Sequence, residues 1–183
     1  MGWAVGVYVL SNCSPVEWLD VGVLVLLCGT SFSGKSTIAR ALAPRLAAQI
    51  VSLDEINERR GLWGGDGIVV EEWVRTLQIA HGEVRELLAA GRSVVVDDTS
   101  SPRFLRDEWR ALAGEVGARF TLLYVDVDHA TVRRRHAANR VDSQRRDVAD
   151  DVLDQHLAGF EVPAADEGAV RVAGVDQACR IGW

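Results

Sequence analysis

Short apolar runs alternate with helical stripes along most of this chain. The runs are rich in Val, Leu and Ile, which is typical of strands buried in a parallel sheet, and they stand at residues 23–28, 49–53, 93–97, 120–127 and 169–173. From Val70 until Gly91, apolar side chains recur at helical spacing, at positions 70, 73, 74, 77, 80, 84, 87 and 88. This alternation predicts an α/β fold, in which a parallel five-stranded sheet carries helices on both faces as a three-layer sandwich.

Five further segments are predicted to be helices, at residues 38–48, 54–60, 102–116, 129–140 and 148–160. We expect Ser101 to cap the third, with Pro102 in its first helical position, and Asp128 to cap the fourth. The third should pack on the sheet through its apolar side chains, which are Phe104, Leu105, Trp109, Leu112 and Val116. Residues 1–20 have no clear period and are interpreted as an N-terminal extension or an added strand, so residues 21–183 form the single predicted domain.

A glycine-containing motif follows the first apolar run and precedes a helical segment. Its sequence is Gly29-Thr30-Ser31-Phe32-Ser33-Gly34-Lys35-Ser36-Thr37, which fits the P-loop pattern G-x-x-x-x-G-K-S/T. The glycines let backbone N–H groups turn toward a phosphate, and the helix N-terminus adds partial positive charge. We expect Lys35, the only lysine of the chain, to reach the β- and γ-phosphates of ATP, and the Ser36 hydroxyl to hold Mg²⁺.

Three acids follow predicted strands, at the sheet edge where ligands of such folds bind. Transfer of a phosphoryl group to an alcohol needs a carboxylate that accepts the hydroxyl proton, and Asp54 is expected to be that base. The alternative for Asp54 is a helix cap. Asp97 ends an apolar strand, as the acid that holds Mg²⁺ through water does in P-loop enzymes, and Asp98 is expected to bind the acceptor hydroxyl. For this pair the alternative is turn formation before Pro102.

Arginines gather late in the chain, at positions 133, 134, 135, 140, 145 and 146. Arginines of a mobile lid can neutralise the charge that develops during phosphoryl transfer. A helix turns by about 100° per residue, so these side chains cannot all face one site. Arg135 and Arg140 are expected to act, the alternative for each being a solvated surface position. Trp63 lies among four glycines at 61–67, in a predicted mobile loop, and is expected to form an apolar wall for the acceptor or simply to pack under that loop.

Composition narrows the possible partners. The net charge of −6 provides no overall field toward nucleic acid or an anionic membrane, which makes a nucleic-acid acceptor unfavourable. The three cysteines are odd in number and far apart, which favours reduced thiols and a cytoplasmic location. No apolar run approaches the length of a membrane span. The oligomeric state is left open.

Several motifs together resemble the P-loop kinase family over roughly residues 22–172. They are the P-loop, Asp-Glu at 54–55, Val-Val-Val-Asp-Asp-Thr at 94–99, the Arg-rich helix and Asp-Asp-Val-Leu-Asp at 150–154. Within that family the chain is similar to the bacteriophage-type polynucleotide kinase domain and to chloramphenicol 3-O-phosphotransferase. The resemblance implies Asp54 as general base, Asp98 as the acceptor-binding acid and lid arginines after the fourth strand. Asn57 stands where polynucleotide kinases carry an arginine, and the Asp97-Asp98 pair is closer to the antibiotic phosphotransferase.

We therefore interpret the chain as an α/β protein of the P-loop NTPase type with a short Arg-rich lid. Its predicted activity is that of an ATP- and Mg²⁺-dependent kinase acting on a hydroxyl of a small molecule, such as an antibiotic or another metabolite. One alternative is a polynucleotide 5′-hydroxyl kinase. Another is a nucleotide-binding switch or regulatory ATPase without an acceptor, although the chain has no Asn-Lys-x-Asp motif for reading guanine.

Overall fold

The computed structural model describes residues 22–62, 68–142 and 148–183. The predicted extension at residues 1–20 lies outside these ranges. So do Trp63 of the glycine-rich loop and the arginines at 145 and 146.

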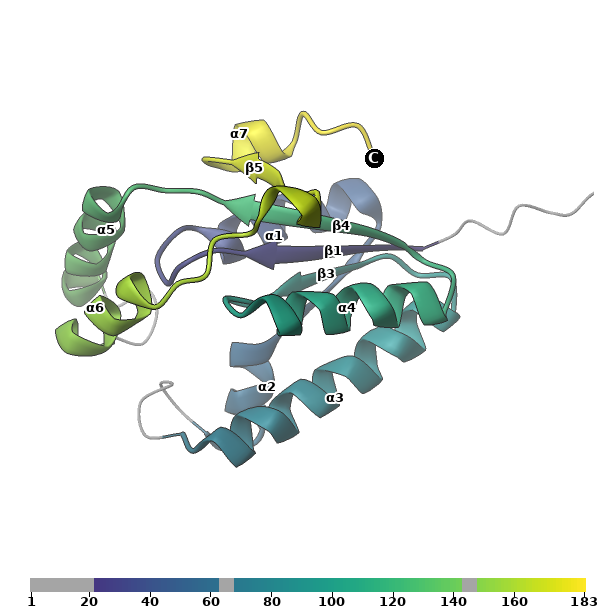
Figure 1. The fold of residues 1–183 in the computed structure, drawn as a ribbon, viewed down its shortest axis with the longest axis horizontal. Helices are drawn as coiled ribbons and strands as arrows, with labels where there is room; N and C mark the ends of the chain where they lie inside the picture. Colours follow the sequence, from purple (N-terminus) through teal and green to yellow (C-terminus); the bar gives the residue numbers. More distant parts are fainter. Residues whose placement is uncertain (1–21, 63–67, 143–147) are drawn as a thin grey trace, which may run out of the picture.

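Five parallel strands form one sheet in the order β2-β3-β1-β4-β5 (Figure 1). Their bounds are β1 Val23–Cys28, β2 Gln49–Ser52, β3 Val94–Asp97, β4 Arg119–Val125 and β5 Val170–Val172. The central strand β1 is buried along its whole length. A strand covered on both faces has no solvent side, which explains why its sequence is an unbroken apolar run. The predicted five-stranded parallel sheet is confirmed.

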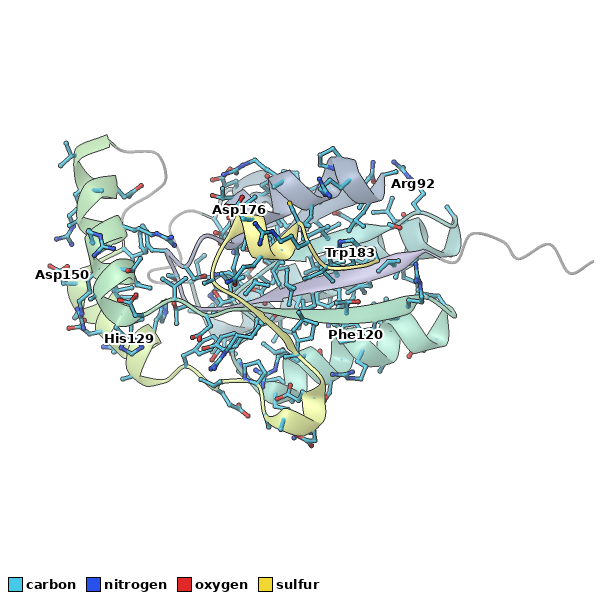
Figure 2. The ribbon with its side chains drawn as sticks, turned by 90° about the horizontal axis from the view of Figure 1, so that it is seen from above. Arg92, Phe120, His129, Asp150, Asp176 and Trp183 are labelled. Atoms are coloured by element: carbon cyan, nitrogen blue, oxygen red, sulfur yellow. The ribbon has the colours of Figure 1, made fainter. Side chains whose placement is uncertain are left out.

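Helices cover both faces of this sheet. Their bounds are α1 Lys35–Leu42, α2 Leu53–Arg59, α3 Val70–Ala89, α4 Arg103–Glu115, α5 His129–Asp142, α6 Asp150–Ala158 and α7 Val175–Ala178, with short 3₁₀ turns η1 Ala43–Leu46 and η2 Ala165–Glu167. Side chains of α2, α3 and α4 pack on one face, and those of α1 and α7 on the other. Helices α5 and α6 lie beyond the C-terminal ends of β1 and β4 (Figure 1). Figure 2 shows His129 and Asp150 of these helices at one end of the molecule, with Arg92 at the other.

Two predicted helices are present, but they start at other residues than predicted. The helix predicted at 38–48 begins already at Lys35 and gives way to η1 after Leu42, because Pro44 has no N–H to continue the α-helical ladder. The helix predicted to start at Pro102 starts at Arg103, with Pro102 as its N-cap residue. The Ser101 hydroxyl, the predicted cap, instead accepts a hydrogen bond from the Glu161 N–H at 3.0 Å.

The packing face of α4 was also predicted wrongly at one position. Phe104 is 62% exposed, whereas Arg106 is fully buried beside Trp109 and Leu112. Hydrophobic periodicity assigns buried positions to apolar residues. The rule fails here because the buried Arg106 is neutralised by Glu167, a carboxylate that is far away in the sequence but in contact with Arg106 in the structure.

The predicted cap of α5 is confirmed. The Asp128 carboxylate accepts hydrogen bonds from the Thr131 N–H and the Thr131 hydroxyl, both at 2.8 Å. These bonds lower the pKa of Asp128, since they stabilise its charged form.

Candidate functional site

The P-loop wraps tightly around the N-terminus of α1. Gly29 has φ 157°, and a Cβ atom there would lie only 2.9 Å from the Val125 carbonyl oxygen. Gly34 has a left-handed φ of 103° as the N-cap residue of α1. Both positions therefore require glycine. The N-terminus of α1 therefore points into the space that the loop encloses, and this arrangement suits the binding of an anion.

Two basic side chains contact the backbone of this loop. Lys35 is buried, and its Nζ donates to the carbonyl oxygens of Gly29 at 2.9 Å and Thr30 at 2.8 Å. From α5, Arg135 Nη1 donates to the carbonyls of Phe32 at 3.2 Å and Ser33 at 2.6 Å. Two positive charges therefore lie at the loop. Lys35 belongs to the P-loop motif itself, and Arg135 comes from α5, about a hundred residues later in the chain.

Phe32 joins the loop to α5 and α6. It is a non-glycine residue with a positive φ of 60°, and its buried side chain clusters with Val132, Leu153 and Leu157. Its ring also contacts that of His136, with 4.9 Å between centroids. The packing of Phe32 in this cluster stabilises an otherwise unfavourable backbone conformation and fixes the two helices over the loop.

Two cavities open beside the loop and share part of their walls. The first cavity, of about 640 Å³, is lined by residues 32–38 and, among others, by Asp54, Asp97, Arg135, Asn139, Gly174 and Val175. The second cavity, of about 390 Å³, is lined by residues 97–102 and, among others, by Ser31, Asp54, Trp73, Leu105, Gln155 and His156. Lys35, Ser36, Asp54 and Asp97 line both cavities. These four residues therefore mark the place where the contents of the two cavities meet.

Strand register explains why the acids converge there. Ser52, the last residue of β2, is level with Asp97, the last residue of β3. Asp54 follows in the first turn of α2 and is exposed. The N-cap of α2 is Ser52, whose hydroxyl accepts from the Glu55 N–H at 3.4 Å, so the alternative of Asp54 as the cap is wrong. The carboxylate of Asp54 is thus placed at the junction of the cavities without serving as the helix cap.

Asp97 is the more buried of these acids. Burial raises the pKa of Asp97, while a hydrogen bond from the Ser36 side chain and the charge of Lys35 oppose that rise. The nearby charges of Asp54 and Asp98 add to the rise. Ser36 and Asp97, the two residues predicted to hold Mg²⁺, are therefore in direct contact through their side chains.

Asp98 is held in a local turn and also lines the second cavity. Its Oδ2 accepts from the Ser100 N–H at 2.8 Å and from the Ser100 hydroxyl at 2.7 Å. Ser100 is buried and has a positive φ of 44°. The turn that was the alternative reading of Asp98 is thus present, and it leaves the carboxylate at the cavity wall.

Arg140 lies apart from the other predicted residues. It is exposed and ion-paired with Asp150 of α6, with 3.1 Å between Nη1 and Oδ2. It does not line either cavity, whereas its neighbour Asn139 is buried and lines the first. Arg133 pairs in the same way with Asp154 at 2.5 Å. Of the predicted lid arginines that the structure describes, Arg135 alone lines a cavity.

Several wall residues of the second cavity were not predicted from the sequence, above all Trp73, Gln155 and His156. Trp73 had been counted only as part of the apolar stripe of α3. It lies in the first turn of that helix, is partly exposed and faces the strand ends. The position of Trp73 at the start of the apolar stripe could have indicated that it lies near the strand ends. Gln155 and His156 carried no signal, because an exposed polar residue on α6 looks like any other.

The described ranges contain neither a membrane-spanning helix nor a ready-made cluster of metal-ligating side chains. Across residues 22–62, 68–142 and 148–183, no helix is long and apolar enough to cross a membrane. Within the same ranges, no group of three or more His, Cys, Asp or Glu side chains could hold a metal ion by itself. An ion at Ser36 and Asp97 would therefore take its remaining ligands from a bound phosphate and water, which is how Mg²⁺ is usually held.

Comparison with known proteins shows which family the chain belongs to. The AAA domain family matches residues 24–163. A shikimate kinase of Nitratidesulfovibrio vulgaris is 36% identical over 71% of this chain and 75% of its own length. A gluconokinase of Gluconobacter oxydans is 27% identical over 82% of each chain. The structure of a sugar kinase from Janibacter sp. superposes with a TM-score of 0.62 at 20% identity, over 86% of this chain and 90% of that one. The chain therefore belongs to the AAA domain family, and it is a P-loop kinase, an ATP-dependent phosphotransferase of the kind that acts on small molecules.

Proposed function

We propose that the chain binds MgATP in the first cavity and transfers its γ-phosphate to a hydroxyl group of a small molecule held in the second cavity. The observation that carries this proposal is the shared wall of the two cavities at Lys35, Ser36, Asp54 and Asp97. In-line phosphoryl transfer requires the donor phosphate and the acceptor oxygen to meet at one point, and these residues surround that point.

The nucleotide phosphates are bound by the loop backbone and two cations. The N–H groups at the start of α1 and the ammonium of Lys35 hold the β- and γ-phosphates. Arg135 bonds to the Phe32 and Ser33 carbonyls of the P-loop and lines the first cavity, so it is the arginine assigned to the γ-phosphate. It would then neutralise charge that develops on the transferring group.

Ser36 and Asp97 are the residues that would hold Mg²⁺. Their contact and their oxygen ligands fit a hard divalent cation. When bound, the ion supplies positive charge to the phosphate oxygens. The burial that raises the pKa of Asp97 would be offset by such a cation, because a nearby positive charge favours the carboxylate.

Asp54 acts as the general base. Its carboxylate takes the proton of the acceptor hydroxyl while the hydroxyl oxygen forms a bond to the γ-phosphorus. The bond from that phosphorus to the β–γ bridging oxygen breaks, and ADP leaves with the electron pair. Asp54 suits this role because it lines both cavities and does not serve as the cap of α2.

The test is transfer of label from γ-labelled ATP to a panel of hydroxyl compounds that includes D-gluconate, shikimate and a 5′-hydroxyl oligonucleotide. Lys35→Ala should abolish transfer, and Asp54→Asn should lower kcat by about 10²- to 10⁴-fold, the usual contribution of general base catalysis, with ATP binding little changed. Asp107→Asn, on the exposed side of α4, is the matched control. Full activity in a folded Asp54→Asn protein would contradict the assigned base. Efficient labelling of the oligonucleotide would instead indicate a polynucleotide kinase, and turnover that no acceptor stimulates would indicate a regulatory ATPase.

A further inference from the structure

More acidic than basic side chains line the second cavity. Carboxylates of Asp54, Asp97 and Asp98 line it, together with the His156 imidazole, hydroxyl and amide side chains, and an apolar part that includes Trp73 and Leu105. Over the described parts of the chain, Lys35 is the only Lys or Arg residue in its wall. In the proposed function Asp97 would be paired with Mg²⁺, so the side-chain charge left for an acceptor in this cavity comes from Asp54 and Asp98 and is negative.

Lys35 is not available to a second anion. Its Nζ already bonds to the carbonyls of Gly29 and Thr30, and it lines the first cavity as well. In the proposed function its charge is directed at the nucleotide phosphates. An acid group on the acceptor would thus find no cation reserved for it among the described residues of the second cavity.

Asp98 is oriented by the surrounding loop. Its Oδ2 is occupied by the two bonds from Ser100, while its Oδ1 makes no hydrogen bond with any residue in the described ranges. The loop itself is fixed at several points. The Thr99 carbonyl accepts from the Gly29 N–H at 3.2 Å, and the Ser100 carbonyl accepts from the Cys28 thiol at 3.4 Å and from Arg106 Nη1 at 3.0 Å.

A carboxylate fixed in this way can accept a hydrogen bond and cannot donate one. It binds a hydroxyl or an ammonium group and repels a carboxylate, phosphate or sulfate. Trp73 adds a flat apolar surface to the same cavity, and such a surface suits the C–H face of a polyhydroxy compound.

We propose that the acceptor is a polyhydroxy compound without an acid group, and that Asp98 selects it by accepting a hydrogen bond from one of its hydroxyls. This inference rests on the proposed kinase function and deepens it, because it assigns the substrate class of the second cavity.

The experiment compares matched pairs of acceptors that differ only in an acid group. D-Glucitol is D-gluconate with CH₂OH in place of the carboxylate, and methyl shikimate is shikimate with the carboxylate esterified. With γ-labelled ATP, kcat/KM should favour the non-acid member of a pair by at least about tenfold, the size of effect expected from like charges brought together in a partly shielded site.

Asp98→Asn then tests the assigned residue. The amide keeps the size of the side chain and an oxygen that can accept from Ser100, and it removes the negative charge. The preference for the non-acid compound should fall several-fold in this variant and stay unchanged in Asp107→Asn, whose carboxylate lies outside the cavity. Thermal unfolding of both variants shows whether either change has disturbed the fold.

Three results would overturn the inference. They are preference for the acid member of the pairs, a preference that Asp98→Asn leaves intact, and failure of every non-acid alcohol while MgATP still binds in a Lys35-dependent manner. A separate arm measures binding of a fluorescent ATP analogue to the wild type and to Lys35→Ala. Absence of Lys35-dependent binding there would refute the proposed function itself, and the inference with it.

Discussion

The buried ion pair between Arg106 and Glu167 should be one of the largest single contributors to stability that a point variant can reveal. The side chains are 0% and 1% exposed. Arg106 Nε donates to Glu167 Oε2 at 2.6 Å, and Nη2 donates to Oε1 at 2.8 Å. The same guanidinium binds the carbonyls of Ser100, Ser101 and Glu161 through Nη1. It therefore joins α4 and η2 to the loop that carries Asp98.

The magnitude follows from this burial. Removal of one partner of a buried pair leaves an uncompensated charge, which costs about 3–5 kcal/mol. Glu167→Gln should therefore lower the free energy of unfolding by about that amount, a large share of the roughly 5–15 kcal/mol that stabilises a typical domain. For a chain of this size each kcal/mol lowers Tm by about 2–4 °C, so a fall of about 6–20 °C is expected.

The assay is urea unfolding followed by circular dichroism on Glu167→Gln and on a double-mutant cycle made of Arg106→Met, Glu167→Leu and the Arg106→Met/Glu167→Leu double variant. Because an apolar pair avoids the unpaired charge, the double variant should be more stable than the sum of the two single losses predicts, with a coupling energy of about 1–3 kcal/mol. Arg103→Met is the control, since its partner Asp166 lies 2.8 Å away but both side chains are exposed, and it should change stability far less. Additive effects, or single losses no larger than that of the control, would refute the reasoning.

Two further predictions concern a glycine and a histidine. Gly29→Ala should abolish binding of a fluorescent ATP analogue, because the added Cβ would lie 2.9 Å from the Val125 carbonyl oxygen. The control is Gly114→Ala on α4, where a Cβ meets nothing within 4 Å, and it should leave binding intact. Equal binding by both variants would show that the loop can adapt. Burial lowers the pKa of His81 below 6.5, so the unfolded chain binds the proton more readily. Its contribution to stability is thus present above about pH 6.5 and is lost as the pH falls toward the lowered value. This part of the pH dependence, measured by urea unfolding between pH 8 and 5, should be missing in His81→Phe, and an unchanged slope would contradict the assignment.

Much of the fold could be predicted because its causes are local. Six consecutive apolar residues, Val23–Cys28, are found as the central strand with the predicted bounds. The P-loop motif predicted a phosphate-binding turn followed by a helix, and the helix is present but starts at Lys35 and not at residue 38. Asp128 capped α5 as expected, since a cap depends only on the three residues that follow it.

The positions of the side chains that line or support the two cavities depend on contacts between residues far apart in the sequence, which no local pattern contains. Arg106 is buried because Glu167 meets it 61 residues later, and a stripe rule cannot foresee that partner. Arg140 pairs with Asp150 while Arg135 reaches the P-loop, a choice made by the rotation of α5 against the loop. Trp73 supplies an aromatic wall of the second cavity, a place that was not predicted from its position in the apolar stripe of α3.

The sequence by itself determined the order of strands and helices, the phosphate-binding loop and the acids at the strand ends, because hydrophobic period, glycine geometry and strand termini act over a few residues. Only the tertiary structure decided which side chains share a cavity. The reason is physical: the walls of the two cavities come from the P-loop, the segment after β3 and side chains of all seven α-helices given above. Their mutual distances depend on how the helices pack on the sheet, where a rotation by one residue directs a side chain into the site or toward solvent.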